Sequence, residues 1–413
     1  MVDQRDTRRL GERLAELRRR QGLTQEELAE QSTVSVSVIR KLERGERDSA
    51  CLSTLRKFAG AMGVTTMQLF APSPTFAGPV DEDERNDLYE LRRVLQPPRG
   101  VDGAALMSLA DDESGPSGDD LTESLRIADR LFRDDDFAAA TAVLPTLITH
   151  ARWTLAESTE DQRRSAWAPL AQAYLLAATL LTQLRKDDLA YHTLGLALEA
   201  GARAEDNGLV GSAVGGETWL LIRQGRLDDA IRVALAAAER LEPSFGHSDR
   251  RHLSSWGWLN LGVAAAAARN SQPEVMTDAM RRAWAAAVRI EGDGPGSRDW
   301  SSFGPTVVTM RDTEMAVVTG SPDKALRIAA RVPAPRRPTN THHRFRLDVA
   351  AALLDQRNRQ EATAVLLELR ATAPNWLRHQ RYAKSITGRL LRATPRAVPQ
   401  ELRDLTGFLQ ISP

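Results

Sequence analysis

Few residues in this sequence have the types and spacing that catalysis requires. The sequence holds no GxxxxGK(S/T) phosphate loop, no Ser/His/Asp order of a hydrolase and no HExxH zinc motif. The glycines of GLVGSAVGG, residues 208–216, follow no predicted strand, so they do not form a dinucleotide fingerprint. His342 and His343 are adjacent, so they point in different directions on a helix, which favours surface or groove residues over metal ligands. We expect no enzyme activity, no metal site and no cofactor.

The cysteine content and the apolar segments indicate where the protein works. Cys51 is the one cysteine and cannot form an internal disulfide, which fits a reducing environment. The N-terminus MVDQRDTRRLGERL is charged from its third residue and lacks the apolar core of a signal peptide. The longest apolar runs, AYLLAATLL and GVAAAAA, are too short to span a bilayer. We expect a cytoplasmic protein with no membrane contact.

The charge is unevenly distributed, although Lys and Arg balance Asp and Glu at 55 each. Residues 1–70 carry 13 basic against 10 acidic side chains, a net charge of +3. Residues 79–120 carry 4 against 12, a net charge of −8. A basic start and an acidic joint are typical of separate modules. We predict an N-terminal domain over 1–70, a linker over 71–120 and a helical domain over 121–413.

Capping signals predict five short helices in the N-terminal domain, the last of them over residues 65–70. Thr24 followed by Glu27 forms a capping box at the start of the second helix. Ser35 is the predicted N-cap of the third helix, and Gly45 ends it. The linker that follows is rich in proline and acidic residues, and the spacing of its leucines between residues 88 and 95 predicts one amphipathic helix.

From Leu121 to the end the pattern is helical, and it repeats. Six predicted helices begin with a turn, a short polar stretch and a small or β-branched residue. These residues are Ala138, Ala190, Ala230, Val275, Ala325 and Ala362. Each interval can hold one pair of helices, so we predict a solenoid of helical hairpins and an all-α protein.

The segment GLTQEELAEQSTVSVSVIRKLERGER, followed by STLRKFAGAMGV, resembles the Cro/C1-type (XRE-type) helix-turn-helix family. The resemblance covers residues 7–70 and implies a five-helix domain whose third helix, Val36 to Arg44, enters the major groove of double-stranded operator DNA. One position departs from the family pattern: Thr33 occupies a turn where glycine is usual, so we expect a slightly strained or altered turn there.

The resemblance also assigns residues to DNA. The matching positions are Gln25, Val36, Ser37, Arg40, Lys41, Arg44 and Arg47. Val36, Ser37 and Lys41 match base contacts, with Arg40 beside them, and the other three match phosphate contacts. A protein-binding or purely structural domain is the alternative, and its net charge of +3 implies weak binding by a single copy.

Residues 121–413 resemble tetratricopeptide (TPR) repeats, in which the first helix of each pair lines a concave groove. Counting back 18, 15, 11, 8 and 7 residues from the repeat residues then selects the groove-facing side chains. They are Gln172, Thr179, Gln183, Trp219, Arg223, Asn260, Glu314 and Arg344. Amide, aromatic and charged groups suit a peptide or polar small-molecule effector. A structural or dimerising scaffold is the alternative.

The combination of domains resembles bacterial transcription regulators with a TPR sensor, of which the peptide-sensing quorum regulators of Gram-positive bacteria are the best-known group. The resemblance implies a homodimer that binds operator DNA and responds to a peptide or small-molecule effector. Two alternatives remain open. One is a TPR adaptor that recruits a protein partner to DNA without a ligand, and the other is a repeat protein whose DNA-binding domain has lost its function.

Overall fold

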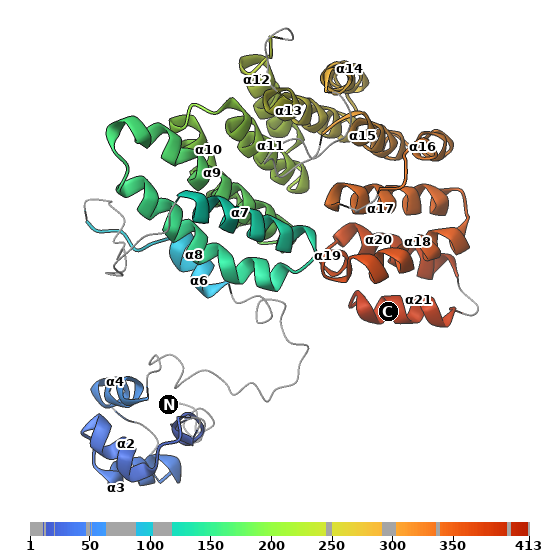
Figure 1. Ribbon diagram of the computed structural model, residues 1–413. Coiled ribbons are helices and arrows are strands. Elements are labelled where there is room, and N and C mark those ends of the chain that lie inside the picture. Colours follow the sequence, from blue (N-terminus) through green and yellow to red (C-terminus); the bar gives the residue numbers. More distant parts are fainter. Residues whose placement is uncertain are drawn as a thin grey trace. The chain divides into compact units, whose positions relative to one another are not determined.

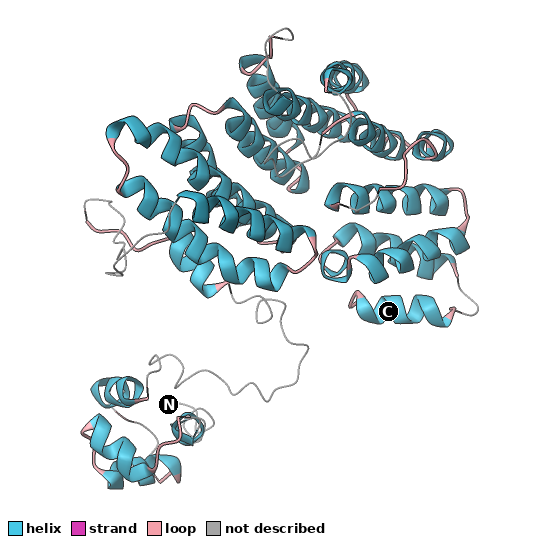
Figure 2. Ribbon diagram, in the orientation of Figure 1, coloured by secondary structure: helices cyan, strands magenta, loops and turns pink. Residues whose placement is uncertain are grey.

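The structure of the chain is a computed structural model. It describes residues 11, 14–19, 21–46, 50, 52–62, 88–101, 118–244, 250–290, 303–335, 339–394 and 398–411. The regular elements of these residues are helices, and no β-strand occurs among them (Figure 2). The chain divides into two compact units, residues 1–82 and residues 83–413. The predicted all-α class is therefore confirmed.

The first unit contains a helical segment over residues 14–19 and three complete helices. These helices are α2 (Gln25–Ser32), α3 (Val36–Glu43) and α4 (Leu52–Ala61). They share one core whose central side chains are at most 1% exposed: Leu14, Leu28, Ile39, Leu42 and Phe58. The predicted fifth helix over residues 65–70 lies outside the described residues.

The predicted caps of the first unit fix where its helices begin. The backbone N–H of Glu27 donates to Thr24 Oγ1 at 3.1 Å, and the N–H of Thr24 donates to Glu27 Oε2 at 2.7 Å. This reciprocal pair confirms the capping box. Ser35 is the N-cap of α3, but its side chain makes no capping hydrogen bond. Gly45 follows α3 with φ of 69° and ends it as predicted.

Thr33 adopts the left-handed conformation that the sequence predicts for the turn between α2 and α3. Its φ and ψ are 52° and 35°. The next N–H, that of Val34, donates to the carbonyl of Ala29 at 3.1 Å and so closes the end of α2. A β-branched residue is disfavoured in this conformation, so the turn between the two helices is strained.

The second unit is a series of helical hairpins followed by three short helices (Figure 1). Its helices are α6 (Tyr89–Leu95), α7 (Gly118–Arg133), α8 (Phe137–Ala156), α9 (Glu160–Gln183), α10 (Asp187–Arg203), α11 (Asn207–Arg223), α12 (Leu227–Arg240), α13 (Arg250–Arg269), α14 (Pro273–Arg289), α15 (Pro305–Val318), α16 (Pro322–Ala329), α17 (Asn340–Asp355), α18 (Arg359–Thr372), α19 (Pro374–Arg378), α20 (Arg381–Ala393) and α21 (Gln400–Phe408). None of the described helices is long and apolar enough to cross a membrane.

The odd-numbered helices from α7 to α17 form an inner row in which each packs against the next. Each even-numbered helix from α8 to α16 packs against its hairpin partner and against the first helix of the following hairpin. This is the stacking expected of a helical-repeat solenoid, because each hairpin buries its apolar face on its neighbours. The inner row therefore positions whatever residues line the concave side.

Six hairpin turns share one geometry, in which a residue with φ between 55° and 77° precedes the cap of the second helix. These residues are Asp135, Arg185, Gly225, Ser271, Gly320 and Arg357. The N–H of the residue that follows donates to the carbonyl five positions back, as from Arg226 to the carbonyl of Leu221 at 3.0 Å. This is a Schellman motif, which ends the first helix and turns the chain into the second.

The fourth residue of each second helix gives the true repeat register. These residues are Ala140, Ala190, Ala230, Met276, Ala325 and Ala362. The five alanines are fully buried where paired helices approach. Four predicted positions are therefore confirmed, whereas Ala138 and Val275 are wrong by two residues and one residue, because the turns before α8 and α14 end later than the sequence pattern suggested.

The helix predicted within the linker packs on the second unit. Leu88, Leu91 and Leu95 are buried with the core that contains α8. Arg152 of α8 also donates from Nη1 to the carbonyl of Val94 at 2.8 Å. Apolar packing of these leucines and the hydrogen bond from Arg152 hold α6 to the hairpins.

Candidate nucleic-acid interface and ligand cavity

The outer face of α3 carries three exposed polar residues in one stripe. Ile39 and Leu42 point into the core and are at most 1% exposed, which fixes the rotation of the helix. Ser37, Lys41 and Arg44 lie on the opposite side and are exposed, one turn apart. The stripe offers a hydroxyl, an ammonium and a guanidinium group, a set that can contact base edges and phosphates.

The remaining predicted DNA residues are placed differently. Val36 is half-buried and packs against the core of the first unit. Arg40 is exposed but donates from Nε to Gln25 Oε1 at 3.3 Å and pairs with Glu26. Arg47 lies outside the described residues. An exposed pair such as that of Arg40 and Glu26 contributes only about 0–1 kcal/mol, so it can open when a phosphate competes.

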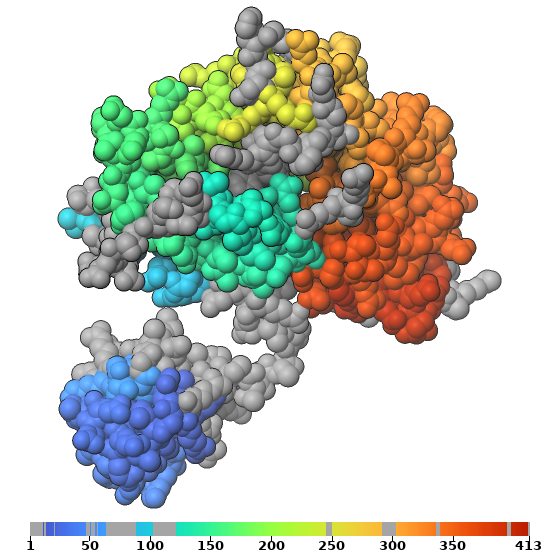
Figure 3. Space-filling model, in the orientation of Figure 1, coloured from blue at the N-terminus to red at the C-terminus, as the bar shows by residue number. Residues whose placement is uncertain are grey.

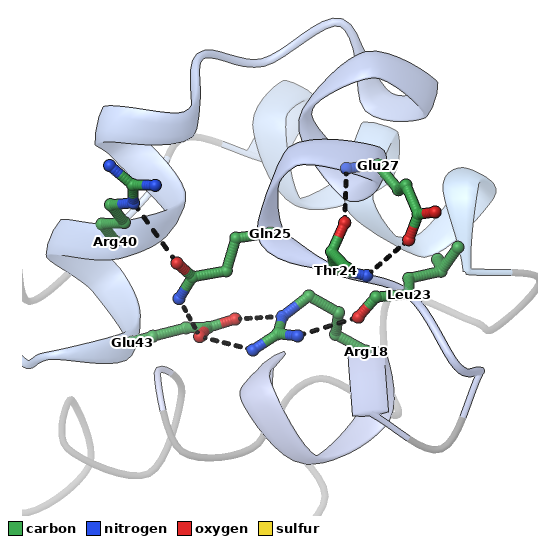
Figure 4. A network of polar contacts seen from close by, with 7 residues as sticks. All are labelled: Arg18, Leu23, Thr24, Gln25, Glu27, Arg40 and Glu43. Carbon is green, nitrogen blue, oxygen red and sulfur yellow. Dashed lines mark hydrogen bonds and ion pairs between the residues drawn. The ribbon is translucent and has the colours of Figure 1, made fainter.

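A buried polar network beneath Gln25 connects three helical segments (Figure 4). Arg18 donates from Nε and Nη2 to the two carboxylate oxygens of Glu43 at 2.8 and 2.9 Å, and from Nη1 to the carbonyl of Leu23 at 2.8 Å. Gln25 Nε2 donates to Glu43 Oε2 at 2.6 Å. The network fixes the end of α3 relative to the start of α2, and with it the presentation of the exposed stripe.

The charge state of this network follows from its geometry. Burial raises the pKa of Glu43, but the hydrogen bonds from Arg18 and Gln25 and the charge of Arg18 outweigh burial, so the pKa lies below its ordinary value. The hydrogen bond to Glu43 raises the pKa of Arg18. Both groups are therefore ionised at neutral pH. Sequence reasoning missed this pair, because residues 25 positions apart meet only once the helices are packed.

The second unit contains a cavity of about 510 Å³ on the concave side of its inner row. Residues from α7, α9, α11, α13, α15 and α17, and from the α19–α20 segment, line it. A cavity of this size falls within the range of small-molecule sites. Five of the eight predicted groove residues line it, and they are Thr179, Gln183, Trp219, Arg223 and Arg344.

Gln172, Asn260 and Glu314 do not line this cavity. Gln172 is half-buried about one turn before Leu175, which does line the cavity. Asn260 is fully buried and donates from Nδ2 to the carbonyl of Trp256 at 3.0 Å. The true repeat residue is Met276 rather than Val275, so the same offset selects Leu261, and Asn260 points away from the cavity.

Glu314 lies behind the cavity wall, where it organises three arginines. It is fully buried, and its oxygens accept from Arg269 at 2.6 Å and Arg311 at 2.7 Å. Arg344 approaches Glu314 and Asp348 only to 3.7 and 3.6 Å. Both oxygens of Glu314 are thus committed to other arginines, and Arg344, which lines the cavity, has the longest ion-pair contacts of the cluster.

Electrostatics in this cluster leave an excess of positive charge. Burial raises the pKa of Glu314, but the charges of Arg269, Arg311 and Arg344 outweigh it and hold the pKa well below its usual range. Burial raises the pKa of Asp348 to about 7 against the opposing charge of Arg344. Near neutral pH, three guanidinium groups therefore face one ionised and one partly protonated carboxyl group.

Aromatic rings hold two of these guanidinium groups in the wall. Arg311 lies over the rings of Trp219 and Trp258, at 5.5 and 5.2 Å from their centroids. Arg344 lies over Trp219 at 5.8 Å and over Tyr382 at 4.4 Å. These cation–π contacts orient the two groups side by side above one indole. Sequence reasoning found Trp219 and Arg344 but missed Arg311, Trp258 and Tyr382.

Glycines of α11 line part of the cavity, and one of them, Gly215, has open space beside it. Gly211, Gly215 and Gly216 line the cavity, and they belong to the run that the sequence showed not to be a nucleotide fingerprint. A Cβ added at Gly215 would meet nothing within 4 Å. A larger side chain at this position would therefore enter the cavity without displacing the backbone. Among the described residues, no group of three or more His, Cys, Asp and Glu could hold a metal ion.

Comparison with known proteins identifies the class of the first unit. Residues 14–69 match the helix-turn-helix family model. The chain is 42% identical, over 69 residues, to the uncharacterized HTH-type transcriptional regulator y4dJ of Sinorhizobium fredii (strain NBRC 101917 / NGR234), a match that covers 16% of this chain and 88% of that protein. The chain therefore belongs to the helix-turn-helix family of transcriptional regulators, which confirms the family resemblance of its N-terminal sequence.

A solved structure gives a broader but weaker similarity. The apo form of the competence regulator ComR from Streptococcus vestibularis is similar over 84% of this chain and 98% of that chain, with 11% sequence identity and a TM-score of 0.30.

Proposed function

We propose that this protein is a transcription regulator that binds operator DNA through the exposed stripe of α3 and responds to an effector bound in the cavity of its second unit. The observation that carries the DNA-binding role is the stripe of Ser37, Lys41 and Arg44, which faces away from a core fixed by Ile39 and Leu42. In helix-turn-helix proteins this face of the second helix of the motif lies in the major groove.

Substitutions on α3 test the DNA-binding role. Lys41→Ala and Ser37→Ala should each weaken binding to the preferred operator by about 1–3 kcal/mol, or roughly 5- to 150-fold, because each removes a base-edge contact. Arg44→Ala should weaken binding to the operator and to random DNA by the same factor, as expected for a phosphate contact. Gel shifts on a selected operator and on random DNA measure both effects.

Lys57→Ala is the matched control, since Lys57 is also exposed but lies on α4. It should leave the preference for the operator unchanged. Equal affinities for wild-type and Lys41→Ala protein on the operator would show that α3 does not read the DNA. Failure of the full chain to bind any DNA would favour the reading in which the domain has lost this function.

The sensory role is supported by the cavity and by the five predicted groove residues that line it. Gly215→Leu should fill the cavity and make DNA binding insensitive to cell extract. Gly195→Leu is the matched control, because Gly195 also lies in a helix with open space around a Cβ but does not line the cavity. If Gly215→Leu protein responds to extract like the wild-type protein, the effector does not bind in this cavity. If the wild-type protein itself does not respond, the adaptor reading replaces the sensory one.

We also propose that the regulator acts as a homodimer through its second unit. A single N-terminal domain with a net charge of +3 makes few phosphate contacts, and tethering two of them raises their effective concentration on DNA. The operator should then be an inverted repeat with half-sites one or more helical turns apart. Light scattering on the full chain should give twice the chain mass, and a monomer both free and on DNA would contradict the proposal.

A further inference from the structure

We infer that the cavity of the second unit takes a small organic carboxylate, with its acid group at Arg344 and an aromatic or apolar body against Trp219 and Trp258. This inference rests on the effector role proposed above and adds the chemical class of the ligand. It is carried by three observations: the charge of the cavity wall, the geometry of the buried ion cluster, and the aromatic surface beside it.

The cavity wall carries one sign of charge. Six arginines line it, and no Asp or Glu of the described residues does. They are Arg133, Arg185, Arg223, Arg311, Arg344 and Arg381. Most of these also have a carboxylate partner: Arg133 pairs with Asp129 at 2.7 Å, Arg311 with Glu314 at 2.7 Å, and Asp187 lies 3.9 and 3.7 Å from Arg185 and Arg223. Arg223 also donates to the carbonyl of Thr182, which lines the cavity, at 2.7 Å. An anionic group that enters the cavity meets guanidinium donors whose carboxylate partners do not themselves line the cavity.

The buried cluster shows where an acid group would bind. Glu314 gives its two oxygens to Arg269 and Arg311, while Arg344 stays beyond hydrogen-bond distance of Glu314 and of Asp348. These two ion-pair contacts of Arg344 are longer than hydrogen bonds, so a ligand carboxylate would give this buried charge a closer partner. Guanidinium groups match carboxylates in shape, because two parallel N–H groups can bond two oxygens.

The rest of the ligand follows from the surroundings of Arg344. Trp219 and Trp258 line the cavity beside Arg311, and Tyr382 lines it beneath Arg344. Leu175, Ile222 and Leu261 add apolar surface from three inner helices. A flat ring or short apolar body fits these walls, and the volume of about 510 Å³ favours a small molecule over a long extended peptide.

Matched acids and amides test the inference on the full-length protein. The probes are benzoate, naphthoate and biphenyl carboxylate, each compared with its primary amide by isothermal titration and by the shift in melting temperature. At least one acid should bind about 10- to 100-fold more tightly than its amide, since the amide cannot form the charged bond to Arg344. Absence of any acid preference across the three pairs would overturn the inference.

Variants locate the binding site. Arg344→Gln should remove the acid preference, and Arg344→Lys should restore part of it. Arg281→Gln is the matched control, because this α14 arginine is 74% exposed and does not line the cavity. If Arg344→Gln unfolds, the double variant Arg344→Gln/Asp348→Asn is measured instead, because it removes both charges of the Arg344–Asp348 pair. An acid preference that persists in a folded Arg344 variant would overturn the assignment.

Two further measurements separate this inference from the sensory role and from a peptide ligand. An acetylated tripeptide with a free C-terminus is compared with its amide, and binding of this peptide acid alone would overturn the small-molecule assignment. An acid that binds through Arg344 but leaves the gel shift unchanged would support the carboxylate site and contradict the sensory role. Mass spectrometry of the denatured, freshly purified protein should detect a co-purified organic acid that Arg344→Gln protein lacks.

Discussion

At the scale of single residues, the Arg18–Glu43 pair determines how the exposed stripe of α3 is presented. The side chains are 10% and 7% exposed and are joined by two short hydrogen bonds. Glu43 is the last residue of α3, so the pair ties this helix to the segment over residues 14–19.

Removing one partner of this pair should be costly. Glu43→Gln leaves the guanidinium of Arg18 buried without its counter-charge, and we expect a loss of about 3–5 kcal/mol in the free energy of unfolding of the first unit. Urea denaturation followed by a probe in this unit measures it. Glu46→Gln is the control, since the Glu46 side chain is 53% exposed and should change stability by under about 1 kcal/mol. Equal stability of the two variants would contradict this account.

The pH dependence of the same pair has a definite sign. The folded pKa of Glu43 lies below its unfolded value, which is about 4.3. The stability that the ionised carboxylate contributes is therefore present above that pH and is lost as the pH falls through the folded pKa. Acid unfolding of the first unit should be less steep in Glu43→Gln than in the wild-type protein.

Single residues also show where sequence reasoning ends. Trp219, Arg223 and Arg344 could be found by counting, because helical periodicity and one correct register suffice. Asn260 was misplaced, because a one-residue error in the register of α14 rotates the selected position by about 100°. The cluster around Glu314 was not recognisable, because two of the arginines that contact it, Arg269 and Arg344, come from α13 and α17.

At the scale of elements, Thr33 places a strained turn inside the helix-turn-helix motif. The left-handed conformation costs a residue with a Cβ about 1–2 kcal/mol, and glycine avoids that cost while losing about 0.4–1 kcal/mol through its freer unfolded chain. Thr33→Gly should therefore raise the free energy of unfolding of the first unit by up to about 1.6 kcal/mol. Thr33→Val should bring no such gain, because valine is also β-branched. A less stable Thr33→Gly protein would show that the threonine side chain has a compensating role.

The helices themselves were largely predictable, because caps, periodicity and helix-ending glycines act locally. The boundaries of α8 and α14 were not, since Asp136 and Gln272 rather than earlier polar residues became the caps. Each helix starts two residues after the left-handed residue of its turn, which explains why α8 and α14 begin later than predicted. At Asp135, Arg185, Ser271 and Arg357 it is not glycine, so composition alone does not mark the turn.

At the scale of the whole second unit, the two ends of the solenoid meet. Figure 3 shows the C-terminal helices beside α7, although the two segments are far apart in the sequence. Asp135, in the turn between α7 and α8, accepts from the backbone N–H groups of Asn375 and Trp376 at 2.7 Å each. The Asn375 side chain donates back to the Asp135 carbonyl at 2.8 Å. The hairpins therefore close around the cavity, a contact between residues 240 apart that no local pattern reveals.

A buried histidine at this closure should make the second unit sensitive to acid. His343 packs against Trp376, with ring centroids 5.4 Å apart, and burial lowers its pKa to about 4. Because the unfolded value is about 6.5, the neutral ring contributes stability that is full above that pH and is lost as the pH falls toward 4. His343→Phe keeps an aromatic contact and should lose less stability between pH 6.5 and pH 4. An identical pH profile for both proteins, measured by thermal unfolding, would contradict this role.

Asp135→Ala should loosen the closure without unfolding the hairpins. Burial raises the pKa of Asp135 to about 6 in spite of its two backbone bonds, so at pH well above 6 the carboxylate is ionised and accepts both N–H groups. Removing it leaves the amides of Asn375 and Trp376 without that acceptor, and their hydrogen exchange should accelerate by about tenfold or more, as expected when a charged hydrogen bond is lost.

Asp136→Ala is the matched control at the neighbouring position, because Asp136 instead caps α8 through the N–H of Ala139 at 3.0 Å. That variant should speed exchange at Ala139 and leave Trp376 unchanged. The cavity is lined by Phe132 on one side of the closure and by Trp376 on the other, so a looser closure should also speed ligand release. Exchange at Trp376 that is the same in Asp135→Ala and wild-type protein would show that apolar packing alone joins the two ends.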